Sequence, residues 1–272
     1  MECLMSADNR WSFPDLDETV SWCAERHGQG IRCTVASLDE FARNRDHAAA
    51  AVRAAVAAVR ALAVSHPDCS VSLKPTALGV LFDKEEYRRN LATVVGEARK
   101  NGIGIEIDME GRDLVDATLH SAGDVAVEYP VTVALQAYLD RTLDDCDFCI
   151  NRGIRIRIVK GAYLGDTGDF PAVQQRLKML IARIAGSGEN FSIGTHDPEV
   201  LAWITGEAGI PRHQVELGFL KGLAEQTKLR LAADGWDVSE YVPFGQQGGA
   251  AYRNRRERYL KLLKDVGREA AP

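Results

Sequence analysis

Apolar and polar residues follow two different periods that succeed one another along the chain. Ile154, Ile156 and Ile158 alternate with Arg155 and Arg157, a period of two among β-branched residues that predicts a strand. Other segments have apolar residues three and four positions apart, which predicts amphipathic helices. We therefore expect strands at residues 31–36, 70–74, 104–108, 131–136, 154–160, 190–195, 214–218 and 240–244, and helices at 46–63, 85–100, 112–121, 139–152, 171–185, 198–208, 224–233 and 251–266.

Eight strands, each followed by a helix, require parallel pairing with right-handed crossovers. The chain has 272 residues, and a (β/α)8 TIM-like barrel has about 250. A further helix is expected near residues 14–27, with Pro14 in its first turn and glycines closing it. The pattern predicts a single-domain α/β barrel, residues 31–272, preceded by an N-terminal helical segment, residues 1–30.

Composition and charge narrow the function. The chain is 46% hydrophobic and 26% charged, which is typical of a globular protein, and its net charge of −6 argues against a nucleic-acid partner. No uncharged run of about 20 apolar residues predicts a membrane span. Met1–Leu4 lacks the layout of a signal peptide, so we expect a cytoplasmic protein. Of six cysteines, Cys146 and Cys149 form a lone CxxC in a predicted helix, which favours reduced thiols over a metal or redox site.

The carboxyl ends of barrel strands meet at one mouth, where such folds bind ligands. Gly161 and Ala162, at the end of the fifth predicted strand, leave room for backbone to approach something flat or charged. The polar residues at the mouth include several cations, few carboxylates and no Ser-His-Asp order. They predict a pocket for an anionic, flat ligand rather than a hydrolase or a metal centre, and they are Lys74, Asp108, Gln136, Arg157, Lys160, Thr195, His196, Glu216 and Tyr241.

The last predicted helix carries two arginines on its apolar side. Tyr252, Arg255 and Arg256 stand at positions i, i+3 and i+4, hence on one face. Because that face should pack on the barrel, the arginines are expected over the mouth, where two guanidinium groups could bind a carboxylate. The same face continues through Tyr259, Leu260, Leu262, Leu263 and Val266.

Seven short motifs, in order between residues 70 and 260, resemble the proline dehydrogenase family, in particular its compact monofunctional type. Members are FAD-dependent (β/α)8 barrels that oxidise proline to Δ1-pyrroline-5-carboxylate, with hydride transfer from ring C5 to flavin N5. The motifs are Val71-Ser-Leu-Lys74-Pro-Thr-Ala-Leu-Gly79, Ile107-Asp108-Met-Glu110, Leu135-Gln136-Ala-Tyr138, Arg157-Ile-Val-Lys160-Gly-Ala-Tyr163, Thr195-His196-Asp197, Tyr241-Val-Pro-Phe-Gly245 and Tyr252-x-x-Arg255-Arg256.

The resemblance implies a role for each matched residue. Lys74, Arg255 and Arg256 would hold the substrate carboxylate, and Asp108 would pair with Lys74. Arg157 would lie beside the reactive edge of the flavin, and Tyr241 and Tyr252 would enclose the pyrrolidine ring, so that Asp108, Arg157 and Tyr241 form the catalytic set. The implied FAD contacts are Met109, Gln136, Arg157, Lys160, Gly161, Ala162, Thr195 and His196.

It also implies FAD as cofactor, with FMN as the alternative, and a place in proline catabolism. Electrons would pass to a quinone, with at most peripheral contact at the inner membrane. Two departures, no acidic residue after the position of Leu164 and Tyr259 where the family has a glutamate, leave open a modified pyrrolidine substrate in a biosynthetic pathway. Two further alternatives are a lyase or aldolase with Lys160 or Lys74 as Schiff-base amine, and a catalytically silent barrel.

Overall fold

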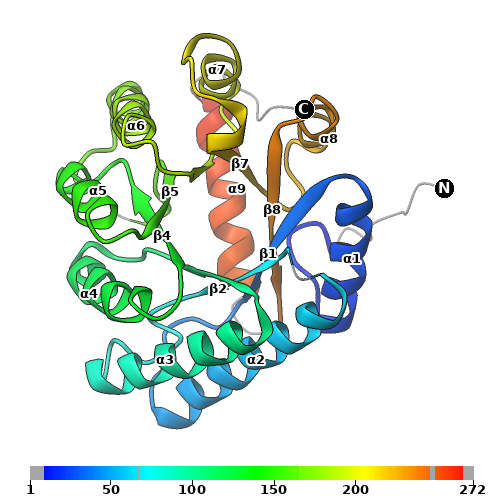
Figure 1. Ribbon diagram of the computed structural model, residues 1–272, viewed down its shortest axis with the longest axis vertical. Helices are drawn as coiled ribbons and strands as arrows, with labels where there is room; N and C mark the ends of the chain where they lie inside the picture. Colours follow the sequence, from blue (N-terminus) through cyan, green and yellow to red (C-terminus); the bar gives the residue numbers. More distant parts are fainter. Residues whose placement is uncertain (1–8, 67, 164, 246–248, 266–272) are drawn as a thin grey trace.

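The computed structural model describes residues 9–66, 68–163, 165–245 and 249–265. Eight parallel strands form a closed barrel in sequence order, which confirms the predicted fold (Figure 1). The strands are β1 (Ile31–Ser37), β2 (Ser70–Leu73), β3 (Gly104–Ile107), β4 (Val131–Gln136), β5 (Arg155–Val159), β6 (Phe191–Gly194), β7 (Val215–Leu220) and β8 (Asp237–Phe244). The expectations for Met1–Leu4, Leu164 and Val266, and for the side chains of Leu262 and Leu263, lie outside the described part.

A helix follows each strand, and one precedes the barrel. The α-helices are α1 (Leu16–Gly28), α2 (Arg45–Ser65), α3 (Lys84–Asn101), α4 (Val115–Ala126), α5 (Thr142–Ile150), α6 (Phe170–Ala185), α7 (Pro198–Ala202), α8 (Glu225–Ala233) and α9 (Gly249–Asp265). Short turns at Arg112–Leu114 and Arg212–Gln214 and a π-helical turn at Trp203–Glu207 complete the list. Pro14 lies outside the first helix, because the Asp15 side chain caps it by accepting a hydrogen bond from the Glu18 amide at 3.0 Å.

The two faces of the barrel strands bury different chemistry. Ile154, Ile156 and Ile158 are at most 3% exposed and pack outward against the helices, as their alternation predicts. The inward face is polar: Arg155 and Arg32 both donate to Glu216, across the barrel, at 3.1 and 2.5 Å. Glu216, expected at the mouth, therefore lies below it, in a group of charge pairs at the other end of the barrel.

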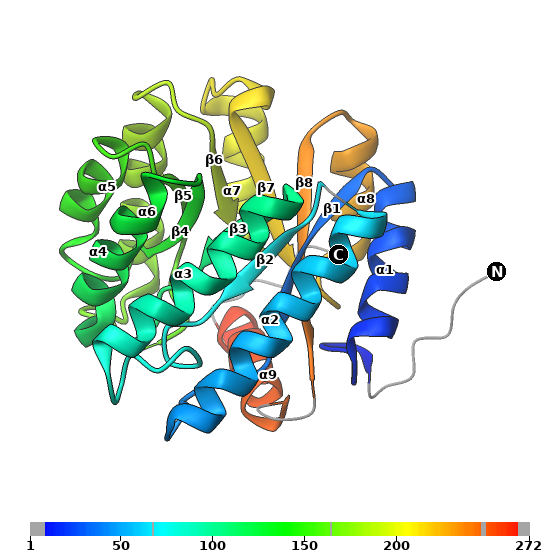
Figure 2. The same cartoon turned by 60° about the horizontal axis from the view of Figure 1, so that its bottom comes forward.

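α2 is the one helix, within the described residues, whose length and composition would allow it to cross a membrane. Its residues Ala55, Ala58, Val59 and Leu62 are buried in the main apolar core. A third of its apolar window is buried, and it takes its place in the ring of helices (Figure 2). This buried side of α2 packs on β1, β2 and α3.

α1 is tied to the strand that closes the barrel. Glu240 of β8 faces outward, and Arg26 of α1 donates to both of its carboxylate oxygens, each at 3.0 Å. The Trp22 indole donates to the same carboxylate at 2.6 Å, and Lys228 of α8 forms an ion pair with it. Glu240 and Lys228 are completely buried, so this network, formed outside the barrel wall, joins α1, α8 and β8.

α9 does not join the ring of helices around the barrel. Figure 1 shows it running across the middle of the ring of helices, beside β8, and Figure 2 shows it at one end of the barrel, next to the end of β8. Its Tyr252 packs on Leu38, after β1, and on Leu223, after β7. Gly245, with φ of +108°, lets the chain leave β8 in a direction that other residues rarely adopt. The sequence predicted a helix packed on the barrel with its arginines at the mouth; the structure lays the helix over the mouth.

Candidate active site

Four side chains meet at the mouth beneath α9, contributed by the ends of β2, β3, β5 and β8. Lys74 donates to the Tyr241 hydroxyl at 3.0 Å, and that hydroxyl donates to Asp108 Oδ2 at 2.8 Å. Lys74 Nζ lies 3.4 Å from the same Asp108 oxygen, so the expected pairing of these two residues is confirmed. Arg157 donates to Asp108 Oδ1 at 2.5 Å. Asp108 is thus held by two cations and one phenol.

Burial and charge together fix the protonation of this cluster. Burial alone would raise the pKa of Asp108, but Lys74 and Arg157 lower it to about 2. Burial would lower the pKa of Lys74, but Tyr241 and Asp108 keep it well above its ordinary value. The pKa of Tyr241 is raised, first by burial and then by the Asp108 charge. Near neutral pH the cluster therefore holds an ionised carboxylate, an ammonium and a neutral phenol.

Arg157 lies between two carboxylates. Besides Asp108, Glu106 approaches its Nε at 3.1 Å. The Tyr241 ring lies above both cations, with its centroid 5.5 Å from the Arg157 guanidinium carbon and 5.6 Å from Lys74 Nζ. These contacts leave Arg157 no freedom to turn away from the mouth. Its position suits the predicted role beside a flavin, which stays a prediction.

The two arginines of α9 face the mouth, as predicted, but they are not equivalent. Arg255 donates to both carboxylate oxygens of Glu40, at 3.0 and 2.5 Å. Arg256 lies over the Tyr252 ring at 4.9 Å, and its buried Nε atom has no hydrogen-bond partner. Sequence reasoning missed Glu40, whose only signal is the acidic pair Asp39-Glu40 in the loop after β1. That loop and the helix above the mouth are therefore joined by one ion pair.

The residues after β6 build their own loop. His196 Nε2 accepts a hydrogen bond from the Leu220 amide at 2.9 Å, so this nitrogen carries no proton. Burial, with the charges of Lys228 and Arg256, lowers the pKa of His196 to about 3. Thr195 Oγ1 accepts from the Asp197 amide at 3.2 Å. A direct flavin contact from Thr195 or His196 stays a prediction.

Lys160 and Ala162 lie at the edge of the mouth after β5. Lys160 donates to Asp197 at 2.8 Å, and its ammonium lies 3.8 Å from the Phe170 ring centre. Ala162 is exposed, whereas Met109, after β3, is buried in the main apolar core. Their flavin contacts also stay predictions.

Gly161 makes room for a flat group, and in the structure that group is Tyr138. A side chain at Gly161 would place its Cβ 1.6 Å from the Tyr138 ring, and one at Gly165 would place it 2.4 Å away. The Tyr138 hydroxyl donates to Gln136 Oε1 at 2.6 Å, while Gln136 Nε2 donates to the Glu110 carbonyl at 2.9 Å. Gln136 and Gly161, both expected to contact flavin, thus contact protein on these sides.

The mouth has the chemistry to receive an anionic ligand and a flavin. Arg256 Nε and the Tyr252 hydroxyl are buried without a hydrogen-bond partner in the described part of the chain, whereas Arg157 Nε has the Glu106 carboxylate beside it. Buried donors without a partner are costly unless a ligand satisfies them. The guanidinium groups of Arg157 and Arg256 suit a carboxylate or an electron-rich ring edge. The residues therefore fit both groups.

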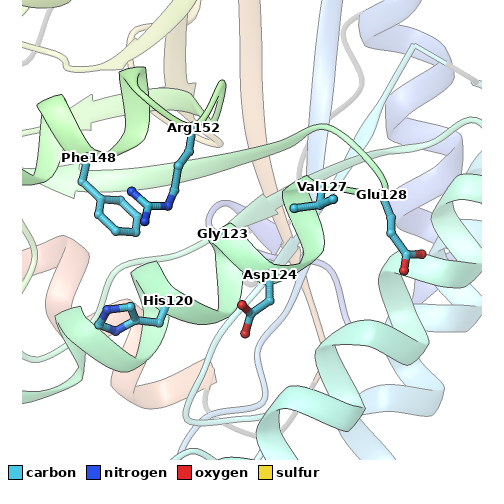
Figure 3. A pocket seen from close by; sticks show the side chains of 7 residues that line it. All are labelled: His120, Gly123, Asp124, Val127, Glu128, Phe148 and Arg152. Carbon is cyan, nitrogen blue, oxygen red and sulfur yellow. The ribbon is translucent and has the colours of Figure 1, made fainter.

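A second hollow, of about 430 Å³, lies on the outer surface between α4 and α5 (Figure 3). It is lined by residues from the later halves of these helices, which lie toward the amino ends of the strands, opposite the mouth. The Arg152 guanidinium covers the Phe148 ring at 3.9 Å, and Glu128 is 73% exposed. This groove has solvated charges and no buried cluster, so the mouth is the better candidate site.

Comparison with known proteins identifies the family of this chain. The family model for proline dehydrogenase matches residues 20–181. Proline dehydrogenase 2 of Bacillus subtilis (strain 168) is 29% identical over 240 residues, which cover 85% of this chain and 79% of that protein. The proline dehydrogenase of Deinococcus radiodurans is 29% identical over 199 residues, covering 68% of this chain and 64% of that protein.

Solved structures share the barrel. Proline utilization A (PutA) from Bdellovibrio bacteriovorus, in a crystal structure of the protein inactivated by N-propargylglycine, superimposes with a TM-score of 0.83 at 20% identity. The match covers 92% of this chain and 32% of that one, so this chain spans about a third of the solved protein. At this identity the likeness concerns the fold.

Proposed function

Because this chain belongs to the proline dehydrogenase family, whose members are flavin-dependent oxidoreductases, we propose that it oxidises L-proline to Δ1-pyrroline-5-carboxylate with FAD. The observation that carries the proposal is the buried set of Lys74, Asp108, Arg157 and Tyr241 beneath the arginines of α9. When bound, FAD supplies the hydride acceptor, its N5 atom, for the hydrogen at ring carbon C5 of the substrate.

The chain's own residues bind and orient the substrate. Lys74, Arg255 and Arg256 are the cations available for its carboxylate, and the orphaned Nε of Arg256 gains a partner when the carboxylate arrives. Asp108 keeps Lys74 charged and in place. Tyr241 and Tyr252 enclose the pyrrolidine ring, which fixes the hydrogen at C5 toward the acceptor.

Glu40 competes with the substrate for Arg255. Its ion pair joins the loop after β1 to α9, and the Arg255 side chain is 17% exposed in this arrangement. A substrate carboxylate that takes over Arg255 releases Glu40, which allows that loop to separate from α9. The pair therefore acts as a gate that the substrate's own charge opens.

Two alternatives differ in how well the contacts support them. A Schiff-base lyase needs an amine that loses its proton easily. Tyr241 and Asp108 instead raise the pKa of Lys74, and Lys160 is paired with Asp197, so neither lysine suits that role. A related pyrrolidine carboxylate remains the second candidate, because Tyr259 stands where the family has a glutamate. The Tyr259 ring packs edge-on to His196, with centroids 5.9 Å apart.

A quinone is the proposed electron acceptor, reached by peripheral contact of a cytoplasmic protein with the inner membrane. Three large apolar side chains stand exposed on the loops after β1 and β2: Phe41 by 50%, Leu81 by 55% and Phe82 by 38%. The outer face of α9 exposes Arg253 and Arg258 above the same mouth. Apolar side chains beside cations suit an anionic bilayer, and sedimentation with anionic and neutral vesicles tests the contact.

The test of function needs only purified protein. A yellow protein whose absorbance is bleached by L-proline without oxygen supports the proposal, and extraction of the cofactor distinguishes FAD from FMN. A yellow protein that ignores proline but is bleached by another pyrrolidine carboxylate supports the second candidate. A protein that is purified without flavin, and that retains none after incubation with FAD or FMN and removal of the free flavin, would falsify both.

A further inference from the structure

A closed ring of hydrogen bonds runs through the mouth beside the site. The Glu110 carboxylate accepts from the Thr76 amide and the Thr76 hydroxyl, both at 2.7 Å, and from the Tyr163 hydroxyl at 3.3 Å. The Tyr163 amide donates to the Tyr138 hydroxyl at 2.7 Å, which donates to Gln136. Gln136 donates back to the Glu110 carbonyl, and the ring closes.

The ring joins the loops after β2, β3, β4 and β5, and each contact lies near the chemistry. Thr76 follows Lys74 by two residues, and Glu110 follows Asp108 by two. Tyr163 stands at the end of the segment that carries Arg157. The distances between Lys74, Asp108 and Arg157 therefore depend on loops that the ring of hydrogen bonds holds together.

Glu110 is the member on which the other contacts converge. It is 1% exposed, and burial raises the pKa of its carboxyl, while the Thr76 hydrogen bonds and the Lys74 charge oppose the rise. Three donors point at its two oxygens. A carboxylate accepts from all three, whereas a leucine side chain at this position accepts from none.

Tyr163 connects the ring to the substrate side of the mouth. The charges of Glu110, Glu40, Lys74 and Asp108 all act on its phenol, whose pKa is raised chiefly by burial. Its hydrogen bond to Glu110, whose carboxylate also holds Thr76 in the loop after Lys74, places the phenol on that side of the mouth. Its direction is set at the hydroxyl by Glu110 and at the backbone by Tyr138.

We propose that Glu110 is a positioning residue for the reaction: through Thr76 and Tyr163 it fixes where Lys74 and the Tyr163 phenol meet the substrate. It does not touch the reacting atoms. This inference rests on the proposed function for its kinetic consequence, although the ring itself can be tested without it.

Glu110→Leu is the primary test. With all three donors left without their acceptor, we expect KM for L-proline to rise about tenfold while kcat changes by less than about threefold. Tyr163→Phe removes one donor and should raise KM about threefold. In the double variant, KM should match that of Glu110→Leu alone, because the lost hydroxyl no longer has its acceptor.

Tyr129→Phe is the matched control. Its hydroxyl donates to the Ile103 carbonyl at 3.0 Å on the outer ring of helices, far from the mouth. This variant should lose stability without any change in KM. If Glu110→Leu lowers the melting temperature but leaves KM unchanged, its role is structural and the proposal is overturned. Should that variant not fold, the comparison of Tyr163→Phe with Tyr129→Phe decides in the same way.

Hydrogen exchange separates this proposal from the proposed function. In Glu110→Leu, the amides of Thr76 and Tyr163 should exchange at least about tenfold faster, since their loops are released. The amides around Tyr129 should be unaffected. This result does not require proline to be the substrate, so a wild-type protein inert to proline would refute the function while leaving the ring to be judged by exchange. Unchanged exchange at both amides would refute the ring.

Discussion

Two buried networks of charges stand on opposite sides of the β8 wall, and they differ in completeness. Glu240 faces outward, where Arg26 and Lys228 satisfy it; in the described residues, no buried polar atom of these three lacks a partner. Its neighbour Tyr241 faces inward, where, among the described residues, Arg256 Nε and the Tyr252 hydroxyl remain without partners. Residues of the same types thus form a closed structural network on one side and an open one, ready for a ligand, on the other.

Replacing the lysine of each network should show the difference between the two networks most strongly. Lys74→Met removes a cation from the open network, and we expect kcat/KM for L-proline to fall about 10³-fold with little change in thermal stability. Lys228→Met is the matched change in the closed network, and its folded form should keep its activity within about twofold. Steady-state kinetics with a soluble acceptor measure both. Equal losses of activity would contradict the distinction.

Glu240→Gln should have the largest effect on stability. It leaves Arg26 and Lys228 with only the half-exposed carboxylate of Glu225, and the loss of the buried carboxylate costs about 3 kcal/mol of unfolding free energy. Urea unfolding measures the loss, and activity per mole of folded enzyme should not change. A fall in activity at full folding would mean that the outer network reaches the site.

His196 is influenced by a cation of each network, Lys228 and Arg256, and it makes the stability of the fold depend on pH. Its pKa in the folded state, about 3, is below the ordinary 6.5, so below pH 6.5 the unfolded chain binds the proton more readily. The stability of the fold therefore declines as pH falls through that value, by about 2 kcal/mol between pH 8 and pH 5. In His196→Gln, urea unfolding at the two pH values should lack this component. An undiminished decline would show that other groups cause it.

Tyr241→Ser sharpens the comparison at a single strand position. The phenol beside ring carbon C4 should crowd an added hydroxyl, so the wild-type protein should favour proline over 4-hydroxyproline. The serine variant should narrow the ratio of the two kcat/KM values about tenfold, although both values should drop because Lys74 and Asp108 lose their bridging hydroxyl. An unchanged ratio of the two kcat/KM values would show that the Tyr241 phenol does not lie beside ring carbon C4.

The barrel could be predicted from the sequence because the alternation of strands and the spacing of apolar residues in helices are local properties. All eight strands lie where they were predicted, although β8 starts at Asp237 instead of residue 240. The position of α9 could not be predicted in this way. Periodicity tells which face of a helix is buried, and Arg255 and Arg256 do lie on that face, but it does not tell what covers the face.

The site was predicted where residues belong to strand ends and missed where they belong to loops. Lys74, Asp108 and Tyr241 follow strands, so their meeting follows from the topology. Glu40 and Glu110 partner other loops, and no spacing along the chain reveals such pairs. Gly161 shows the opposite error: the room it provides was recognised, but the ring that fills it belongs to Tyr138.

The attachment of α1 has a practical consequence for shortening the chain. Residues 1–30 and 31–272 describe an order along the sequence, but Arg26 and Trp22 complete a charge cluster on the last strand. A gene trimmed to start at Ile31 would encode a barrel whose seam between β8 and β1 has lost its cover, and we expect it to yield insoluble protein. Affinity tags and fusion partners belong ahead of Trp11, where they leave that seam intact.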